Sequence, residues 1–194
     1  ILEREKGIEK IERLTWIVQG RSVSGRWDRI FENEITDYKV TSVWSIVYKS
    51  RYEEWRDQLS IYRWLFYKVK NVLLKETGYV VALLRDWSDK NTQPLKSGKT
   101  NNYPKAPAIQ IPFKLRSIED TEKFVETKVK AITEAEKLED SLLPRCTDDE
   151  RWWNPKTHTY LRCVKYCEVS SFCQQLKKEK ELESIPLGED ILLP

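Results

Sequence analysis

The sequence predicts an α/β domain in which helices flank a mixed central sheet, followed by a cysteine-bearing tail. Three observations favour this fold class. Short runs rich in β-branched and aromatic residues open the core, and an amphipathic helical segment separates them from a wholly apolar run. Beyond Pro144 the composition changes to cysteine, tryptophan and charge. We therefore expect a core over residues 1–144 and a metal- or cluster-binding tail over residues 145–194, packed on the core.

The first part of the core indicates a helix and then three antiparallel strands. Residues 2–13 are charged and compatible with a helix, and because the chain contains no methionine we expect the start of this helix to be missing. Turn-forming residues separate the runs that follow, which predict strands over residues 14–18, 22–31 and 35–41.

The second part of the core alternates helices with strands. Apolar residues recur at helical spacing over residues 53–70. A wholly apolar run after Gly78 predicts a buried strand, and a later strand that contains Pro112 suits the edge of a sheet. A serine with an acid three residues later begins the last helix. The predicted elements are a helix over residues 53–70, a strand over 79–84, a loop over 88–107, a strand over 108–115 and a helix over 117–138.

Composition limits the classes of function only loosely. The 34 basic and 31 acidic residues leave a net charge of +3, which permits a locally basic cleft but does not by itself indicate a nucleic-acid-binding protein. No apolar run reaches the roughly 18 residues of a membrane span, and no secretory signal opens the chain. We expect a cytoplasmic protein with no membrane partner.

Two carboxylates and an amine form the candidate active site. Asp37 and Lys39 are two residues apart, so in a strand their side chains leave the same face, and Asp28 lies in the preceding segment. Asp28, Asp37 and the carbonyl of Tyr38 offer the oxygen ligands that Mg²⁺ or Mn²⁺ prefers. Lys39 is suited to position a water molecule and to stabilise negative charge on a phosphate. This pattern indicates metal-dependent hydrolysis of a phosphodiester.

An aspartate two residues before a lysine is common by chance, so the residues around the pair matter. Gly25 precedes Asp28 by three residues, and a glycine in a strand permits close approach of another group. Gln58 and Tyr62 share one face of the next predicted helix, where they are suited to contact a phosphate or a base.

These residues together resemble the PD-(D/E)XK nuclease superfamily, in its RecB and lambda-exonuclease-like branch. The order G-x-x-D, D-x-K and Q-x-x-x-Y carries the likeness over roughly residues 12–155. Segments 37–44, 82–88 and 143–152 further resemble bacteriophage members. The resemblance implies a restriction-endonuclease-like core, with Asp28 and Asp37 holding metal, Lys39 handling the water, and Gln58 and Tyr62 positioning the strand.

The chain departs from this family at one metal ligand. Members usually supply a histidine or glutamate from an N-terminal helix, whereas the one histidine here, His158, lies far downstream. Glu3 is the candidate within the sequence, and a solvent-exposed helical residue is the alternative interpretation. The true ligand could also precede Ile1.

Four cysteines in the tail form a second candidate centre: Cys146, Cys163, Cys167 and Cys173. Disulfides do not suit a chain without secretory features. Zinc would take all four thiols, or three with His158, and a [4Fe–4S] cluster would take all four. The family resemblance favours the iron–sulfur cluster, with zinc and free thiols as alternatives. The chain departs from the family in two ways: the gap between the first two C-terminal cysteines is three residues instead of the usual two, and the family's fourth cysteine usually precedes the nuclease core. The bound group would attach the tail to the core.

The eight tryptophans have two possible roles. Trp55 and Trp64 lie on the apolar stripe of a predicted helix, so we expect them in the core. Trp27 and Trp44 flank the candidate active site, and for these two a core position and stacking on bases of single-stranded DNA remain open.

The sequence thus predicts a Mg²⁺- or Mn²⁺-dependent deoxyribonuclease, expected to act as an exonuclease on linear or single-stranded ends in phage-type recombination or replication. An endonuclease with the same chemistry is the nearest alternative, and a non-catalytic, metal-stabilised DNA-binding module is the alternative from another class. The tail could bind a recombinase or helicase, and the chain could form homo-oligomers.

Overall fold

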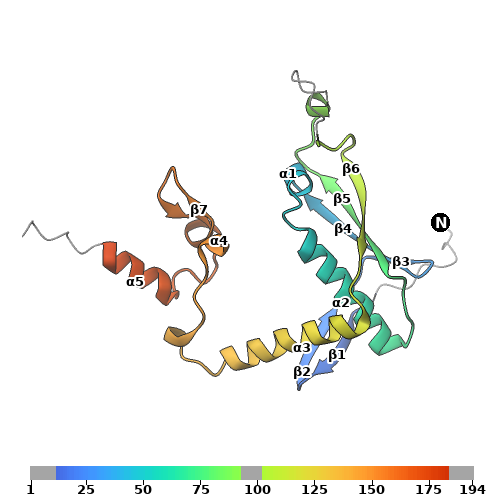
Figure 1. The fold of residues 1–194 in the computed structure, drawn as a ribbon, viewed down its shortest axis with the longest axis horizontal. Helices are drawn as coiled ribbons and strands as arrows, with labels where there is room; N and C mark the ends of the chain where they lie inside the picture. The colour runs from blue at the N-terminus through green and yellow to red at the C-terminus, as the bar shows by residue number, and fades with distance from the viewer. Residues whose placement is uncertain (1–11, 93–101, 184–194) are drawn as a thin grey trace, which may run out of the picture. The chain divides into compact units, whose positions relative to one another are not determined.

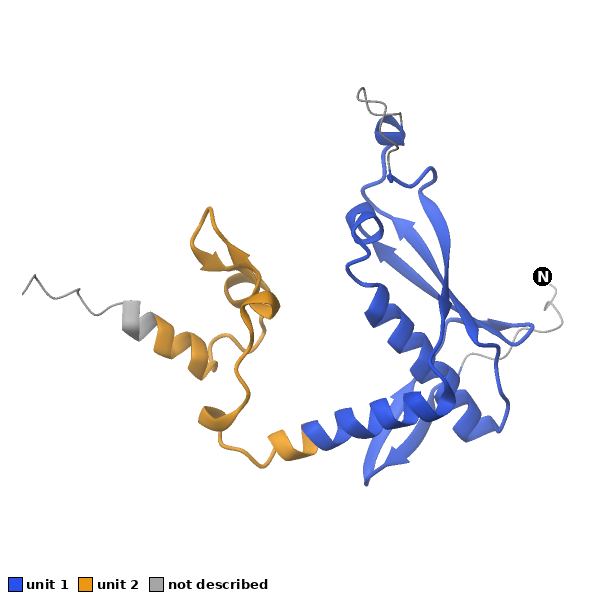
Figure 2. Ribbon diagram, in the orientation of Figure 1, with its two compact units in different colours: residues 1–131 blue, residues 132–194 orange. Residues whose placement is uncertain are grey.

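The computed structural model describes residues 12–92 and 102–183 (Figure 1). The chain divides into two compact units, residues 1–131 and residues 132–194 (Figure 2), and each is described here by itself. The division therefore comes before the boundary at residue 144 that composition indicated. Most of the predicted N-terminal helix over residues 2–13 lies outside the described residues.

A mixed four-stranded sheet forms the centre of unit 1. Its order is β3 (Arg29–Phe31), β4 (Glu34–Thr41), β5 (Thr77–Leu84) and β6 (Ala108–Lys114). The β4–β5 pair is parallel and the other two pairs are antiparallel. A parallel pair requires a crossover, and helix α2 (Tyr52–Lys70) supplies it. The predicted α/β class, with a mixed sheet flanked by helices, is confirmed.

The predicted single strand over residues 22–31 is wrong, because this segment forms two strands. Strand β2 (Arg21–Gly25) pairs with β1 (Leu14–Val18) in a separate hairpin, and β3 begins only at Arg29. Between them the side chain of Trp27 is buried, with 2% of its surface exposed, and its ring meets Phe66 edge-on at 5.3 Å. Burial of this indole breaks the ladder and directs the chain from one sheet to the other.

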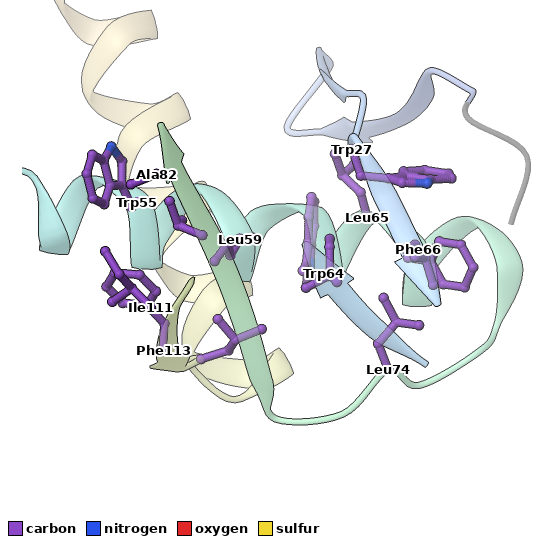
Figure 3. Close-up of a cluster of buried hydrophobic side chains, with 14 of the residues drawn as sticks. Trp27, Trp55, Leu59, Trp64, Leu65, Phe66, Leu74, Ala82, Ile111 and Phe113 are labelled. Carbon is purple, nitrogen blue, oxygen red and sulfur yellow. The ribbon is translucent and has the colours of Figure 1, made fainter. Parts of the chain in front are cut away.

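Helix α2 covers the sheet and supplies much of the core (Figure 3). Trp55, Leu59, Trp64 and Leu65 are fully buried, and they are spread around most of the circumference of the helix. The sheet contributes alternate residues, as expected for strands with one face against a helix. Those of the inner strands are Ile35, Val80, Ala82 and Leu84.

Two further helices belong mainly to unit 1. Helix α3 (Ile118–Ala135) is shorter than the predicted helix over 117–138; it buries Thr121, Val125 and Val129, whereas Ile132 near its end is exposed. Helix α1 (Val43–Val47) was not predicted; it follows β4 directly and is capped by Ser42. A 3₁₀ turn, η1 (Asp89–Thr92), comes after β5.

Unit 2 consists of short elements with little apolar burial. Among residues 132–179, the part of this unit whose burial is described, only Arg151 is buried. None of the described helices of the chain has the length and apolar character to span a membrane. The elements of unit 2 are η2 (Asp140–Leu142), α4 (Asp148–Arg151), β7 (Trp153–Asn154), β8 (Thr159–Tyr160), the π-helical segment η3 (Arg162–Tyr166) and α5 (Gln174–Glu183).

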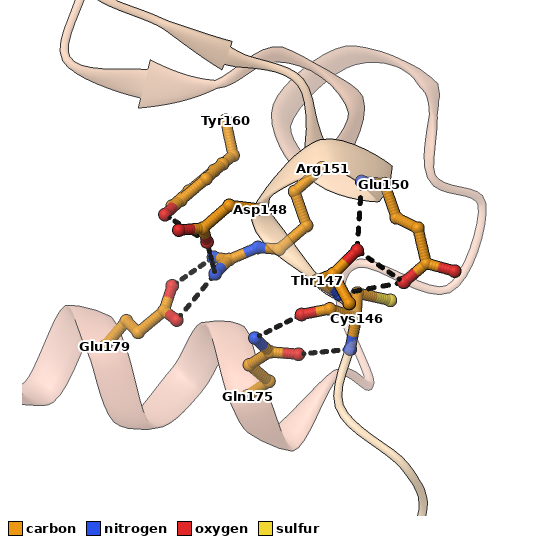
Figure 4. A network of polar contacts seen from close by, with 8 residues as sticks. All are labelled: Cys146, Thr147, Asp148, Glu150, Arg151, Tyr160, Gln175 and Glu179. Atoms are coloured by element: carbon orange, nitrogen blue, oxygen red, sulfur yellow. Dashed lines mark hydrogen bonds and ion pairs between the residues drawn. The ribbon is translucent and has the colours of Figure 1, made fainter.

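A charged network holds unit 2 together (Figure 4). The guanidinium of Arg151 donates to both carboxylate oxygens of Glu179, on α5, and lies 3.5 Å from the centre of the Tyr160 ring. Thr147 and Glu150 form a reciprocal capping box at the start of α4. The charge of Arg151 therefore connects α4, β8 and α5.

Candidate active site

The β3–β4 hairpin brings the two predicted carboxylates together. Its register pairs Arg29 with Thr36, so Asp28 lies opposite Asp37 one position further along. Asp28 Oδ2 accepts a 2.8 Å hydrogen bond from the backbone N–H of Tyr38. Because β3 begins only at Arg29, the carboxylate of Asp28, and not a backbone carbonyl of that strand, accepts from the Tyr38 N–H.

Lys39 lies beside Asp37, as the strand periodicity predicted. Their side chains share a face of β4, and Lys39 Nζ is 2.8 Å from Asp37 Oδ2. The side chain of Tyr38 points to the opposite face and is exposed. The strand therefore presents an acid and an amine on one face, with the peptide group of Tyr38 between them.

Asp37 is an unusual carboxylate, because only 4% of its surface is exposed and its ionised form is poorly solvated. Burial raises the pKa of Asp37 above the ordinary value; the Lys39 ammonium opposes this shift, and the neighbouring Asp28 carboxylate adds to it. Oδ2 of Asp37 is buried and lies 2.8 Å from Lys39 Nζ, its ion-pair partner. A divalent cation at this carboxylate would add to the charge of Lys39 and favour the ionised form.

The donor set fits a hard divalent cation, since two adjoining carboxylates supply oxygen ligands. Within residues 12–92 and 102–183, however, no three histidine, cysteine or acidic side chains are grouped to hold a metal ion. Glu3, the predicted further ligand, lies outside the described residues. The carbonyl of Tyr38 stays a prediction.

Gln58 and Tyr62 come together on α2, where the amide of Gln58 donates a 2.7 Å hydrogen bond to the Tyr62 hydroxyl. A Cβ added to Gly25 would lie 2.8 Å from Cε1 of Tyr62, so this glycine permits close packing of β2 on the Tyr62 ring. Within the described residues, neither Gln58 nor Tyr62 makes a hydrogen bond to Asp28, Asp37 or Lys39.

A groove of about 390 Å³ runs along this face of α2. Glu54 lines this groove, and its pKa is lowered mainly by its hydrogen bond from Arg51. Sequence reasoning missed Glu54, which its position one helical turn before Gln58 could have indicated. The lining residues are Ser24, Glu54, Asp57, Gln58, Ile61, Tyr62 and Phe124.

The four tryptophans near the site differ in how far they are buried. Trp55 and Trp64 are buried, as predicted. Trp27 is also buried, so the possibility that it stacks on a base is wrong. The remaining one, Trp44, is 52% exposed.

The four cysteines are free thiols in unit 2 and do not converge in the described residues. Cys146 and Cys173 line one groove of about 440 Å³, together with apolar side chains that include Phe172. Cys163 interacts instead with the guanidinium of Arg151. His158, the alternative zinc ligand, packs edge-on against Trp153.

Comparison with known proteins gives no family for this chain. No protein-family model matches it, and no curated protein is significantly similar in sequence. One solved crystal structure, of a protein called SSO0001, matches with 16% sequence identity and a TM-score of 0.46 over 86% of this chain. This chain spans 60% of the length of that structure.

Proposed function

We propose that the chain is a Mg²⁺- or Mn²⁺-dependent deoxyribonuclease with a restriction-endonuclease-like core. The observation that carries the proposal is the meeting of Asp28, the buried Asp37 and Lys39 on one hairpin and one face of β4. Structural Asp–Lys pairs are normally exposed, whereas the acid of this pair is buried and adjoins a second carboxylate. The cost of that arrangement is relieved by a bound cation.

Each residue has a distinct task in this proposal. A bound divalent cation supplies Lewis acidity and a more acidic water molecule. Asp28 and Asp37 hold the cation, and the hydrogen bond from the Tyr38 N–H fixes the orientation of Asp28. Lys39 orients the attacking water and stabilises charge on the phosphate. Gln58 and Tyr62, locked to each other, position the strand along the α2 groove.

The substrate is DNA with a free end, and the action is exonucleolytic, as in the phage-type recombination enzymes that the sequence resembles. Of the residues that line the α2 groove, Gln58 and Tyr62 offer polar groups to a strand, and Ile61 and Phe124 offer apolar surface.

The test is degradation of linear DNA by the full chain with Mg²⁺ or Mn²⁺. Asp37→Ala and Lys39→Ala should each lower the rate by at least about 100-fold while DNA binding persists. Lys75→Ala is the matched control, since Lys75 also pairs with an acid, Glu34, but on the exposed side of the sheet. Equal degradation by wild type and the Asp37→Ala variant would overturn the proposal.

We further propose that the tail thiols bind a [4Fe–4S] cluster, with zinc as the alternative. The support is energetic: Arg151 is the one buried side chain among residues 132–179, so unit 2 needs another source of stability. Metal analysis of anaerobically purified protein should find about four iron atoms per chain. Zinc at one atom per chain, lowered by His158→Ala, would show the Cys₃His alternative, and the absence of both would exclude a metal in the tail.

A further inference from the structure

Helix α1 presents two aromatic rings to solvent. Trp44 and Tyr48 stack at 5.8 Å between ring centres with an angle of 22° between their planes. They are 52% and 72% exposed, although burial of such rings normally contributes strongly to stability. A stacked and exposed aromatic pair is a surface on which a further planar group can stack.

The surrounding structure holds Trp44 in place. Its ring meets the buried Tyr103 edge-on at 6.4 Å, and the hydroxyl of Tyr103 accepts a hydrogen bond from the Ser88 N–H. Asp86 uses both carboxylate oxygens at the start of α1, accepting from the Ser42 hydroxyl and the Val43 N–H at 2.6 and 2.7 Å. Because the ring is already ordered, a ligand that stacks on it loses little conformational entropy.

The pair lies between the two elements that carry the candidate active site. Helix α1 occupies the interval between β4, which bears Lys39, and α2, whose first turn bears Glu54; Figure 1 shows it beside the carboxyl end of β4. Three exposed cations adjoin residues of this cluster in sequence: Lys49 follows Tyr48, Arg85 precedes Asp86, and Lys105 comes shortly after Tyr103. The carboxylate of Asp86 stays ionised and partly offsets the charge of Arg85, its neighbour in sequence.

We propose that Trp44 and Tyr48 form a stacking platform for unpaired bases of a nucleic-acid strand, with Lys49, Arg85 and Lys105 attracting its phosphates. The planar rings suit the bases of a single strand and the cations suit its phosphates. Stacking of this kind does not depend on the base sequence. This inference rests on the proposed nuclease function and names its substrate: a strand with unpaired bases.

The experiment is fluorescence anisotropy with the full chain in EDTA, so that no cleavage occurs. The probes are a labelled 20-nucleotide thymidine strand and an abasic strand of the same length. Trp44→Ala/Tyr48→Ala should weaken binding to the thymidine strand by about 10-fold or more and leave binding to the abasic strand within about 2-fold. Tyr48→Ala alone, at a largely exposed position, is the variant that should keep its fold. Trp16→Ala is the matched control, because Trp16 is also exposed but lies on the β1–β2 hairpin.

Equal weakening on both strands, or no weakening at all, would overturn the platform. Unchanged strand binding with a loss of self-association in sedimentation would make the surface a protein interface instead, and would also overturn it. The proposed function is tested separately with Mg²⁺. A chain that binds through Trp44 but degrades no DNA would refute the nuclease alone, whereas degradation with unaltered strand binding by the double variant would refute the platform alone.

Discussion

At the scale of the residue, Asp37 shows how one side chain opposes the stability of the fold around it. Its carboxylate is buried beside a second carboxylate, and a single ammonium, with 26% of its side chain exposed, compensates it in part. The folded protein therefore binds a proton at Asp37 more tightly than the unfolded chain does. Stability falls as the pH rises through the raised pKa, and the loss is complete above it.

We expect Asp37→Asn to stabilise the metal-free protein at neutral pH, because it removes the ionised carboxylate. The gain should diminish as the pH falls and vanish below the ordinary aspartate pKa of about 3.9, where the wild-type side chain is protonated in both states. Thermal unfolding in EDTA across this pH range measures the effect. A wild type more stable than the variant at pH 8 would contradict it.

The same substitution should weaken Mn²⁺ binding by at least about 100-fold, measured as loss of the Mn²⁺-induced rise in unfolding temperature. In the wild type, that rise should grow with pH, because the proton competes with the cation at Asp37. Asp89→Asn, which changes an exposed acid, is the control.

Gly25→Ala tests the packing of β2 against α2. The new methyl group would meet Tyr62 at 2.8 Å, so we expect a loss of about 1–3 kcal/mol in the free energy of unfolding. Urea denaturation measures this loss, and combination with Tyr62→Ala should remove most of the additional cost. Ser24→Ala, next along the strand and exposed, should change stability by less than about 0.5 kcal/mol.

At the scale of the element, periodicity predicted most of what the structure contains. Helix α2, strands β1 and β4 to β6 and the body of α3 follow their apolar patterns, because each packs against a core. The break at Trp27 was not predictable, since an aromatic residue in a β-rich run suits a strand, and only packing on Phe66 turns it inward. Helix α1 was missed because its five residues are too few to show a period.

The sequence spacing predicted that the carboxylates of the candidate site meet, but it did not predict the contacts that depend on the packing of α2. The interval from Asp28 to Asp37 matches a hairpin, so the sequence could indicate that the carboxylates meet. The contact of Gly25 with Tyr62 and the influence of Lys39 on Glu54 depend on how α2 packs, which no local pattern specifies.

The end of α2 offers a test of backbone conformation. Asn71 adopts the left-handed conformation, with φ 54°, and its N–H donates to the carbonyl of Tyr67. Asn71→Gly should stabilise the protein by up to about 1 kcal/mol, and Asn71→Val should destabilise it by about 1–2 kcal/mol. Chemical denaturation of both variants measures the difference, and the same stability for the two would contradict the assigned conformation.

At the scale of the whole molecule, the two units differ in their source of stability. Unit 1 has a continuous apolar core, whereas the described part of unit 2 depends on Arg151. Burial lowers the pKa of Arg151, but its hydrogen bonds and charge interactions with Glu179 and Cys163 outweigh this, and the net pKa is raised. The guanidinium therefore stays charged wherever the fold survives.

Arg151→Met should therefore unfold unit 2 selectively. The variant keeps the volume but loses the ionic hydrogen bonds to Glu179 and the contact with Tyr160, a loss of at least about 2 kcal/mol. Limited proteolysis should show new cleavage between residues 145 and 179, with unit 1 still protected. Lys165→Ala, at an exposed position, should leave the digestion pattern unchanged, and cleavage throughout unit 1 would show that the units are not independent.

Both borders of the central sheet are unsuited to further strand pairing. On one side β3 has three residues, and on the other β6 carries Pro112, which has no N–H to donate. A short strand and a proline are features that prevent sheets of neighbouring molecules from joining edge to edge. At the high local concentrations of a crowded cell, this core should therefore resist fibrillar aggregation, and any assembly it forms should use its helices or sheet faces.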